Sequence, residues 1–113
     1  MEKYELINED WELNPDNVNN LLLNLKEESG GEWKYKGFQA EIGGGWVFEL
    51  EERFGGREGS GEEHWVIFSL SKDNQKTFWQ IDGYYASYDG AYLDGDAYEV
   101  EKAEKLVTVW NKK

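Results

Sequence analysis

The chain has 113 residues and a formal net charge of −12 at neutral pH, because it contains 24 aspartates and glutamates but only 12 lysines and arginines. A field of that sign repels nucleic-acid phosphates and anionic lipids and attracts basic protein surfaces, so we expect no direct nucleic-acid or membrane partner. Aromatic residues make up 16% of the chain, which excludes a disordered protein, and the lack of cysteine excludes disulfides and thiolate metal sites.

These bulk features indicate one domain spanning residues 1–113. The length suits a single hydrophobic core. No run approaches the roughly 20 apolar residues that a membrane helix needs, and the opening MEKYELINED is unlike a signal peptide. We therefore expect a single-domain cytoplasmic protein.

The first third of the chain predicts one helix. Residues 1–13 are ambiguous between a short helix, a strand and an extended arm. Asn14 and Pro15 then form a helix start signal, and Ser29-Gly30-Gly31 a stop signal. Between them an apolar stripe recurs at helical spacing: Val18, Leu21, Leu22 and Leu25. We expect an amphipathic helix from about residue 15 to 28.

From residue 32 onward the hydrophobic period is two, which is typical of strands. We expect one bent strand or two short ones over 32–42, and strands over 46–54, 64–70 and 77–81. The final segment 98–110 alternates in two halves, with a bend or bulge near Ala103. Two assignments follow from the alternation: Trp46, Phe48 and Leu50 point inward, and 64–70, apolar on both faces, is central.

Short connections favour antiparallel neighbours in a meander, and a helix laid on one face is the simplest way to bury the leucine stripe. The predicted fold class is therefore α+β, with an N-terminal helix packed on a four- to five-stranded, mainly antiparallel sheet.

Several patterns that could carry chemistry are better explained without it. The glycine-rich stretch 55–61 matches no phosphate-loop spacing and predicts a hairpin loop. His64, the only histidine, has no recognisable nucleophile partner and is expected on the sheet surface. The loop aspartates lack the order of a calcium loop, and a short chain leaves little room for a glycosidase cleft between paired glutamates. We expect no enzyme activity, no cofactor and no metal.

The segment from Tyr84 to Tyr98 is the strongest candidate for a functional surface. Five tyrosines lie there among three aspartates, and no lysine or arginine occurs between Lys76 and Lys102. Tyrosine is a frequent interface anchor, although these rings could equally pack as cross-strand neighbours. We take Gly83 as the hinge between a core strand containing Phe78, Trp79 and Ile81 and this presented segment. The predicted partner-binding residues are Tyr84, Tyr85, Tyr88, Asp89, Tyr92, Asp94 and Asp96.

The C-terminal half, from FGGREGSGEEHWVIFSL through TFWQIDGYYASYDGAYLDGDAYEVEKAEKLVTVW, resembles a group of small acidic proteins of bacteriophages and mobile elements. Its most specific element is GYYxSYDG, and the resemblance covers about half the chain. The resemblance implies an inhibitor of host machinery or of antiviral defence, of the anti-CRISPR or anti-restriction kind, in the host bacterial cytoplasm. It carries over no catalytic residues.

The expected function is therefore that of an acidic binding protein that inhibits a host nucleic-acid-handling or defence complex. Its partner would be a basic protein surface, which nucleic-acid mimicry by carboxylates could engage. The alternative is a structural or accessory assembly protein that acts as a small homo-oligomer such as a homodimer. An enzyme with an unrecognised site is a third reading.

Overall fold

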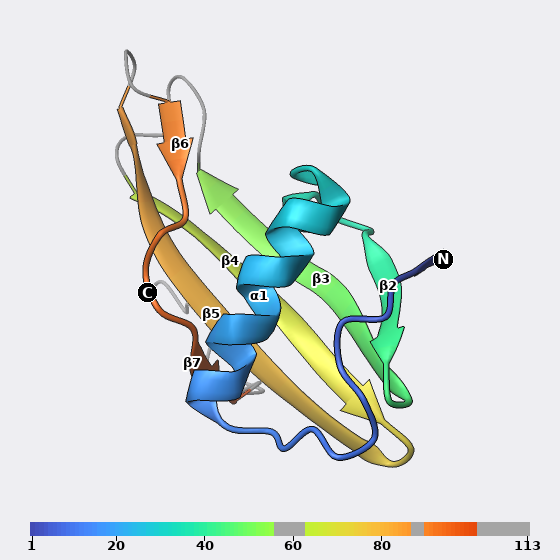
Figure 1. Cartoon of the computed structure of the whole chain (residues 1–113). Helices are drawn as coiled ribbons and strands as arrows, with labels where there is room; N and C mark the ends of the chain where they lie inside the picture. Colours follow the sequence, from blue (N-terminus) through green and yellow to red (C-terminus); the bar gives the residue numbers. More distant parts are fainter. Residues whose placement is uncertain (56–62, 87–89, 102–113) are drawn as a thin grey trace, which may run out of the picture.

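The computed structural model describes residues 1–55, 63–86 and 90–101. Within these ranges the chain forms one α-helix, one 3-10 turn and seven strands (Figure 1). In chain order the elements are β1 (Glu2–Lys3), α1 (Pro15–Ser29), η1 (Glu32–Lys34), β2 (Gln39–Gly43), β3 (Trp46–Gly55), β4 (Glu63–Lys72), β5 (Gln75–Ala86), β6 (Gly90–Tyr92) and β7 (Tyr98–Val100).

The sheet has the order β1-β2-β3-β4-β5-β6, and β7 also pairs with β5. All neighbours are antiparallel except β1 and β2, which are parallel. The α+β class, the single helix and the mostly antiparallel sheet are thus confirmed, and 64–70 is central as predicted. The expected four to five strands are an undercount, because β1, β6 and β7 are two or three residues long and too short to show an alternation.

Helix α1 begins and ends where its sequence signals lie. The Asn14 side chain accepts a hydrogen bond from the backbone N–H of Asn17 at 2.8 Å, which satisfies one of the free donors of the first turn. Pro15 takes the first helical position. Gly30 ends the helix in the left-handed conformation, with φ 62°.

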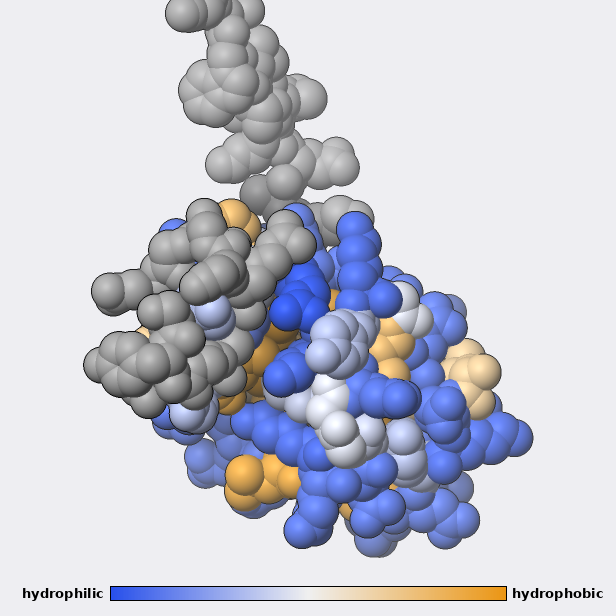
Figure 2. Space-filling view, turned by 90° about the horizontal axis from the view of Figure 1, so that it is seen from above, coloured by the Kyte–Doolittle hydropathy of each residue, from blue (hydrophilic) through white to orange (hydrophobic). Residues whose placement is uncertain are grey.

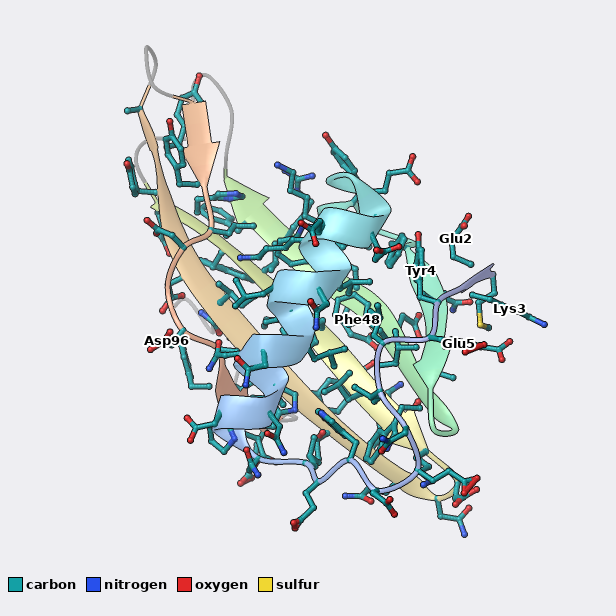
Figure 3. The ribbon with its side chains drawn as sticks, viewed as in Figure 1. Glu2, Lys3, Tyr4, Glu5, Phe48 and Asp96 are labelled. Carbon is teal, nitrogen blue, oxygen red and sulfur yellow. The ribbon has the colours of Figure 1, made fainter. Side chains whose placement is uncertain are left out.

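The core lies between α1 and one face of the sheet (Figure 1). The leucine stripe of α1 is buried against alternate residues of the three long strands, and the rings of Phe48 and Phe68 stack with centroids 4.9 Å apart. Figure 3 shows Phe48 beside α1, on the side of the sheet that the helix covers. The main sheet contributions are Trp46, Phe48 and Leu50 from β3, Val66, Phe68 and Leu70 from β4, and Trp79 and Ile81 from β5.

The ambiguous N-terminal residues form an extended arm along β2. The backbone N–H groups of Tyr4 and Leu6 donate to the carbonyls of Glu41 and Ile42 at 2.7 and 2.9 Å. Farther along, the Trp11 ring meets the Trp46 ring edge to face at 5.4 Å. The arm therefore covers the β2 edge of the sheet.

Two local expectations are wrong. The segment 32–38 is not a strand: Gly31 and Gly37 have φ of 96° and 94°, and the turns that they make bury Trp33 at the end of the core. His64 is not on the surface but only 2% exposed, since the register turns it to the helix side. Its Nδ1 atom lies 2.9 Å from the carbonyl oxygen of Phe54.

The surface of the described residues is mainly hydrophilic when seen from above, with hydrophobic residues in a few separate areas (Figure 2). Among these residues no helix is long and apolar enough to span a membrane.

Because the core lies on one side of α1, substitutions of two leucines in this helix should lower the free energy of unfolding by different amounts. Leu21 is 1% exposed and Leu23 is 64% exposed. Leu21→Ala should lower the free energy of unfolding by about 2–5 kcal/mol, because it leaves a cavity under the helix. Leu23→Ala should change it by less than about 0.5 kcal/mol. Urea unfolding followed by circular dichroism measures both, and similar losses would contradict this placement of the core.

Candidate functional site

The structure divides the predicted partner-binding residues between different places. Tyr84 and Tyr92 are a cross-strand pair on β5 and β6, with ring centroids 5.1 Å apart. Tyr85 pairs with Ala91 one position along, so its side chain points to the opposite side of the sheet. Tyr88 and Asp89 lie outside the described residues.

Asp94 and Asp96 belong to the connection between β6 and β7, which we call the strap (Leu93–Ala97). Two side chains of α1 hold it: the Lys26 ammonium donates to the Leu93 carbonyl at 3.0 Å, and the Asn19 amide oxygen accepts from the Ala97 N–H at 2.8 Å. Leu93 and Ala97 are buried, whereas both aspartates are exposed. Asp96 lies at the edge of the sheet opposite Glu2 and Lys3 (Figure 3).

Gly83 is not a hinge, because β5 continues through it to Ala86. A Cβ atom at this position would collide with the carbonyl oxygen of Tyr92. The residue is therefore required by the close approach of the backbone where β6 leaves the sheet and the strap begins.

The strongest concentration of exposed aromatic side chains lies on the sheet face turned away from α1, which we call the open face. Side chains alternate between the two faces of a sheet, so the register assigns each residue to one of them. Phe54, Tyr84 and Tyr98 are each 43% exposed and Tyr92 is 41% exposed. The open face carries six aromatic residues within the described ranges: Phe54, Trp65, Phe78, Tyr84, Tyr92 and Tyr98.

A β-bulge in β3 places the side chains of Glu51, Glu52 and Phe54 on the open face. Leu50 pairs with Phe68 and Glu52 with Ile67, so Glu51 is an extra residue that shifts the alternation. After the shift Arg53 points to the helix side and Phe54 to the open face. There the Phe54 ring stacks on Trp65 with centroids 5.5 Å apart.

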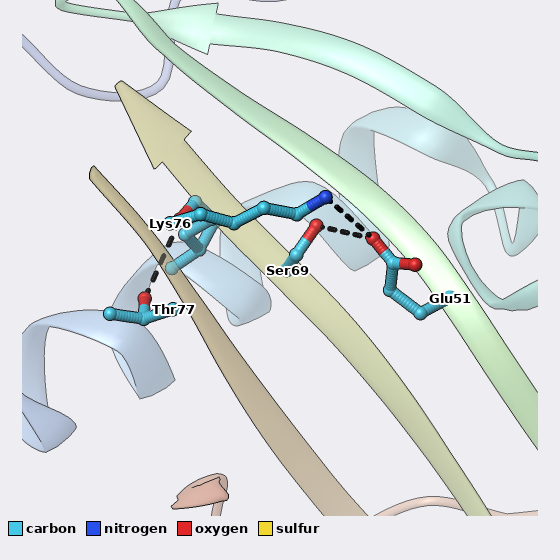
Figure 4. Close-up of polar contacts among 5 residues, drawn as sticks. Glu51, Ser69, Lys76 and Thr77 are labelled. Carbon is cyan, nitrogen blue, oxygen red and sulfur yellow. Dashed lines mark hydrogen bonds and ion pairs between the residues drawn. The ribbon is translucent and has the colours of Figure 1, made fainter. Parts of the chain in front are cut away.

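Carboxylates are interleaved with these rings. Glu51 accepts a hydrogen bond from the Ser69 hydroxyl at 2.8 Å and lies 3.5 Å from the Lys76 ammonium (Figure 4). Helix α1 lies behind the strands in that view, which places these side chains on the open face. The open-face carboxylates of the three long strands are Glu49, Glu51, Glu52, Glu63 and Asp82.

Asp82 links the centre of this surface to its edge. Its two carboxylate oxygens accept hydrogen bonds from the Gln80 amide at 2.8 Å and from the Tyr98 hydroxyl at 2.9 Å. The pKa of Tyr98 is raised, first by burial and then by the hydrogen bond to Asp82 and its negative charge. Tyr98 thus stays a neutral donor beside an ionised acceptor.

Cations are scarce on the same surface. In their described parts β3, β4 and β5 carry three cations: Arg53, Lys72 and Lys76. The register turns Arg53 and Lys72 to the helix side, where they lie over the rings of Tyr35 and Trp46. The three strands therefore leave only Lys76 on the open face.

The sequence prediction missed Phe54, Trp65 and the open-face glutamates. One signal could have found them. The strand 64–70 is apolar on both faces, but one helix can cover only one of those faces, so the other must present Trp65 and Ile67 at the surface.

A hollow of about 330 Å³ lies beside the strap and is lined partly by Lys26, Trp33, Lys34 and Asp94. Burial lowers the pKa of Lys26, the nearby Lys34 lowers it further, and Asp94 opposes the shift. The ammonium already has the Leu93 carbonyl and the Trp33 ring, 5.4 Å away, as partners. Nowhere in the described ranges do three potential metal ligands gather.

Comparison of the chain with protein-family models, with curated proteins and with solved structures finds no match.

The bond between Tyr98 and Asp82 predicts a measurable titration. Asp82→Asn should lower the pKa of Tyr98 toward its ordinary value, because the charge and the ionic acceptor are lost and burial alone remains. A raised folded-state pKa stabilises the protein at neutral pH, and this contribution is lost as pH rises through the folded pKa. The loss begins at the unfolded-state pKa in both proteins, so the variant should show a smaller alkaline loss of stability that is complete at a lower pH.

The titration is followed by NMR of the Tyr98 ring. Glu99→Gln is the matched control, since it removes one charge from the neighbouring residue, which points to the helix side. Equal shifts in the two variants would contradict a specific effect of Asp82.

The close approach at Gly83 predicts that a single methyl group is costly. Gly83→Ala should lower the free energy of unfolding by about 1–3 kcal/mol, because the strap backbone must move away. Gln80→Ala on the same strand should cost less than about 0.5 kcal/mol. Chemical denaturation of the two variants checks this. An unchanged denaturation midpoint for Gly83→Ala would refute the close approach of the Tyr92 backbone to Gly83.

Proposed function

We propose that this chain is a binding protein that docks its open face on a basic protein surface and thereby inhibits a nucleic-acid-handling or antiviral defence complex. In this proposal it contacts neither nucleic acid nor membrane directly. The partner's basic surface is the one that would otherwise hold nucleic-acid phosphates, and the open-face carboxylates replace them.

The observation that carries the proposal is the composition of the open face. Partly exposed Trp and Tyr rings lie among five carboxylates there, and Lys76 is the one cation that the described parts of the long strands contribute. Aromatic anchors supply most of the energy of protein interfaces, and complementary charge supplies association rate and specificity. A cation-poor aromatic surface is suited to a partner rich in lysine and arginine.

Two further features support this choice. The net charge of −12 steers the whole molecule toward basic surfaces and away from phosphates. The resemblance to small acidic phage proteins suggests the biological setting, an inhibitor produced against its bacterial host.

The binding part of the proposal is tested with a synthetic peptide that alternates arginine and tryptophan, titrated into the full-length chain by calorimetry at low salt. The open-face variant is Glu52→Gln, Glu63→Gln and Asp82→Asn, three exposed carboxylates of that face. It should bind about tenfold more weakly, since exposed charge pairs contribute roughly 0.5 kcal/mol each. Its affinity should also fall less steeply with added salt.

The matched control removes three equally exposed charges elsewhere: Glu9→Gln, Glu27→Gln and Glu28→Gln. An equal loss in the control would mean that net charge alone attracts the peptide, which overturns the assignment of the open face. A larger loss in a strap variant, Asp94→Asn with Asp96→Asn, would move the site to the strap.

Inhibition is tested separately on purified enzymes: a Cas nuclease, a restriction endonuclease and a bacterial RNA polymerase. The full-length chain should inhibit at least one of them, and the open-face variant should be weaker. A chain that inhibits none and whose mass by light scattering rises with concentration would favour the accessory homo-oligomer instead.

A further inference from the structure

The C-terminal segment 102–113 leaves the described structure beside the open face. Strand β7 pairs with β5 so that Val100 lies opposite Phe78, on the open-face side of the sheet. Glu101 is the last described residue, and twelve residues follow it. The segment therefore starts at the rim of the surface proposed to bind a partner.

The charge of this segment is opposite to that of the rest of the chain. Residues 102–113, KAEKLVTVWNKK, contain four lysines and one glutamate, whereas residues 1–101 contain eight basic and 23 acidic residues. The middle of the segment is apolar, with Leu106, Val107, Val109 and Trp110. A basic peptide with an aromatic anchor is the same chemistry that the open face fits in a partner.

The segment is also long enough to cover that face. Twelve extended residues span at most about 40 Å, at roughly 3.3 Å per residue. The segment starts at β7, which pairs with β5, so β3 is three strand spacings away, or about 15 Å. The lysines of the segment can therefore reach Glu51 and Glu52 on β3 as well as Asp82 on β5.

We propose that the C-terminal segment docks on the open face of its own chain and competes there with the basic partner. This inference rests on the proposed function for its consequence, but the docking itself can be observed without any partner. The same chain is favoured over a second copy for two reasons. The linkage gives the segment a high effective concentration, and two acidic bodies repel each other.

The test uses the absence of cysteine from the chain. A nitroxide spin label on Asn111→Cys, in the full-length chain, broadens NMR signals of nuclei near the segment. The Trp65 indole N–H lies on the open face, where it donates to Glu63 at 3.1 Å, whereas Trp33 is buried at the helix side. The Trp65 signal should be broadened much more than the Trp33 signal.

A second label position serves as control. Asn24→Cys places the label on the exposed side of α1, so the preference should reverse and Trp33 should be broadened more than Trp65. Equal broadening of the two signals by the Asn111→Cys label would overturn docking on the open face. A chain that fails this test but still binds the basic peptide through the open face leaves the proposed function intact.

Charge reversal tests whether the lysines of the segment hold it on the acidic open face. Lys112→Glu with Lys113→Glu should shift the docked-to-undocked ratio about fivefold toward undocked, and the Trp65 broadening should fall accordingly. Lys34→Glu with Lys36→Glu makes the same charge change at η1 and the turn after it, and should leave the broadening unchanged. Equal effects of the two pairs would overturn the charge match.

A mixing experiment shows whether the docked segment belongs to the same chain or to a second copy. Spin-labelled chains without isotope are mixed with isotope-labelled chains without spin label. No broadening of Trp65 in this mixture supports docking within one chain. Broadening in the mixture would show that the segment of a second copy occupies the face and would overturn the proposal.

Discussion

One helix can cover only one face of a sheet, and the rest of this molecule depends on that constraint. The apolar stripe of α1 buries Phe48, Phe68 and Trp79 beneath it. No second helix in the described chain shields the opposite face. The central strands must therefore combine one apolar face with one that tolerates water. Tyr and Trp, which join a large apolar ring to a polar tip, suit such a surface, and carboxylates keep it hydrated. The open face is thus a consequence of the fold as well as a candidate for binding.

The parts of the fold that depend on local chemistry were predictable. Asn14, Pro15 and Gly30 act within one helix turn, so the sequence signals predicted the bounds of α1 to within one residue. Alternation within a single strand likewise predicted the inward side chains of β3 up to Leu50. In each case the cause and its effect lie within a few residues of each other.

The parts that depend on distant segments were not predictable in the same way. The bulge at Glu51 is defined by the pairing of β3 with β4, and no residue near Glu51 signals it in the sequence. His64 is buried because its strand pairs with Gly83 on one side and Gly55 on the other. The candidate site also depends on segments that are distant in the sequence. The sequence indicated Tyr84 and Tyr92, but their neighbours on the open face come from strands up to forty residues away.

The bulge in β3 has a consequence for how this protein tolerates insertions and deletions. Before it, even-numbered side chains point to α1, and after it, odd-numbered ones do. Loss of Glu51 itself would remove the extra residue and restore an unbroken alternation, with Arg53 still toward α1 and Phe54 still on the open face. A deletion within the regular part of the strand would instead move the side chains on one side of it to the opposite face. The bulge therefore marks the position where β3 tolerates the loss of one codon without exchanging its buried and exposed side chains.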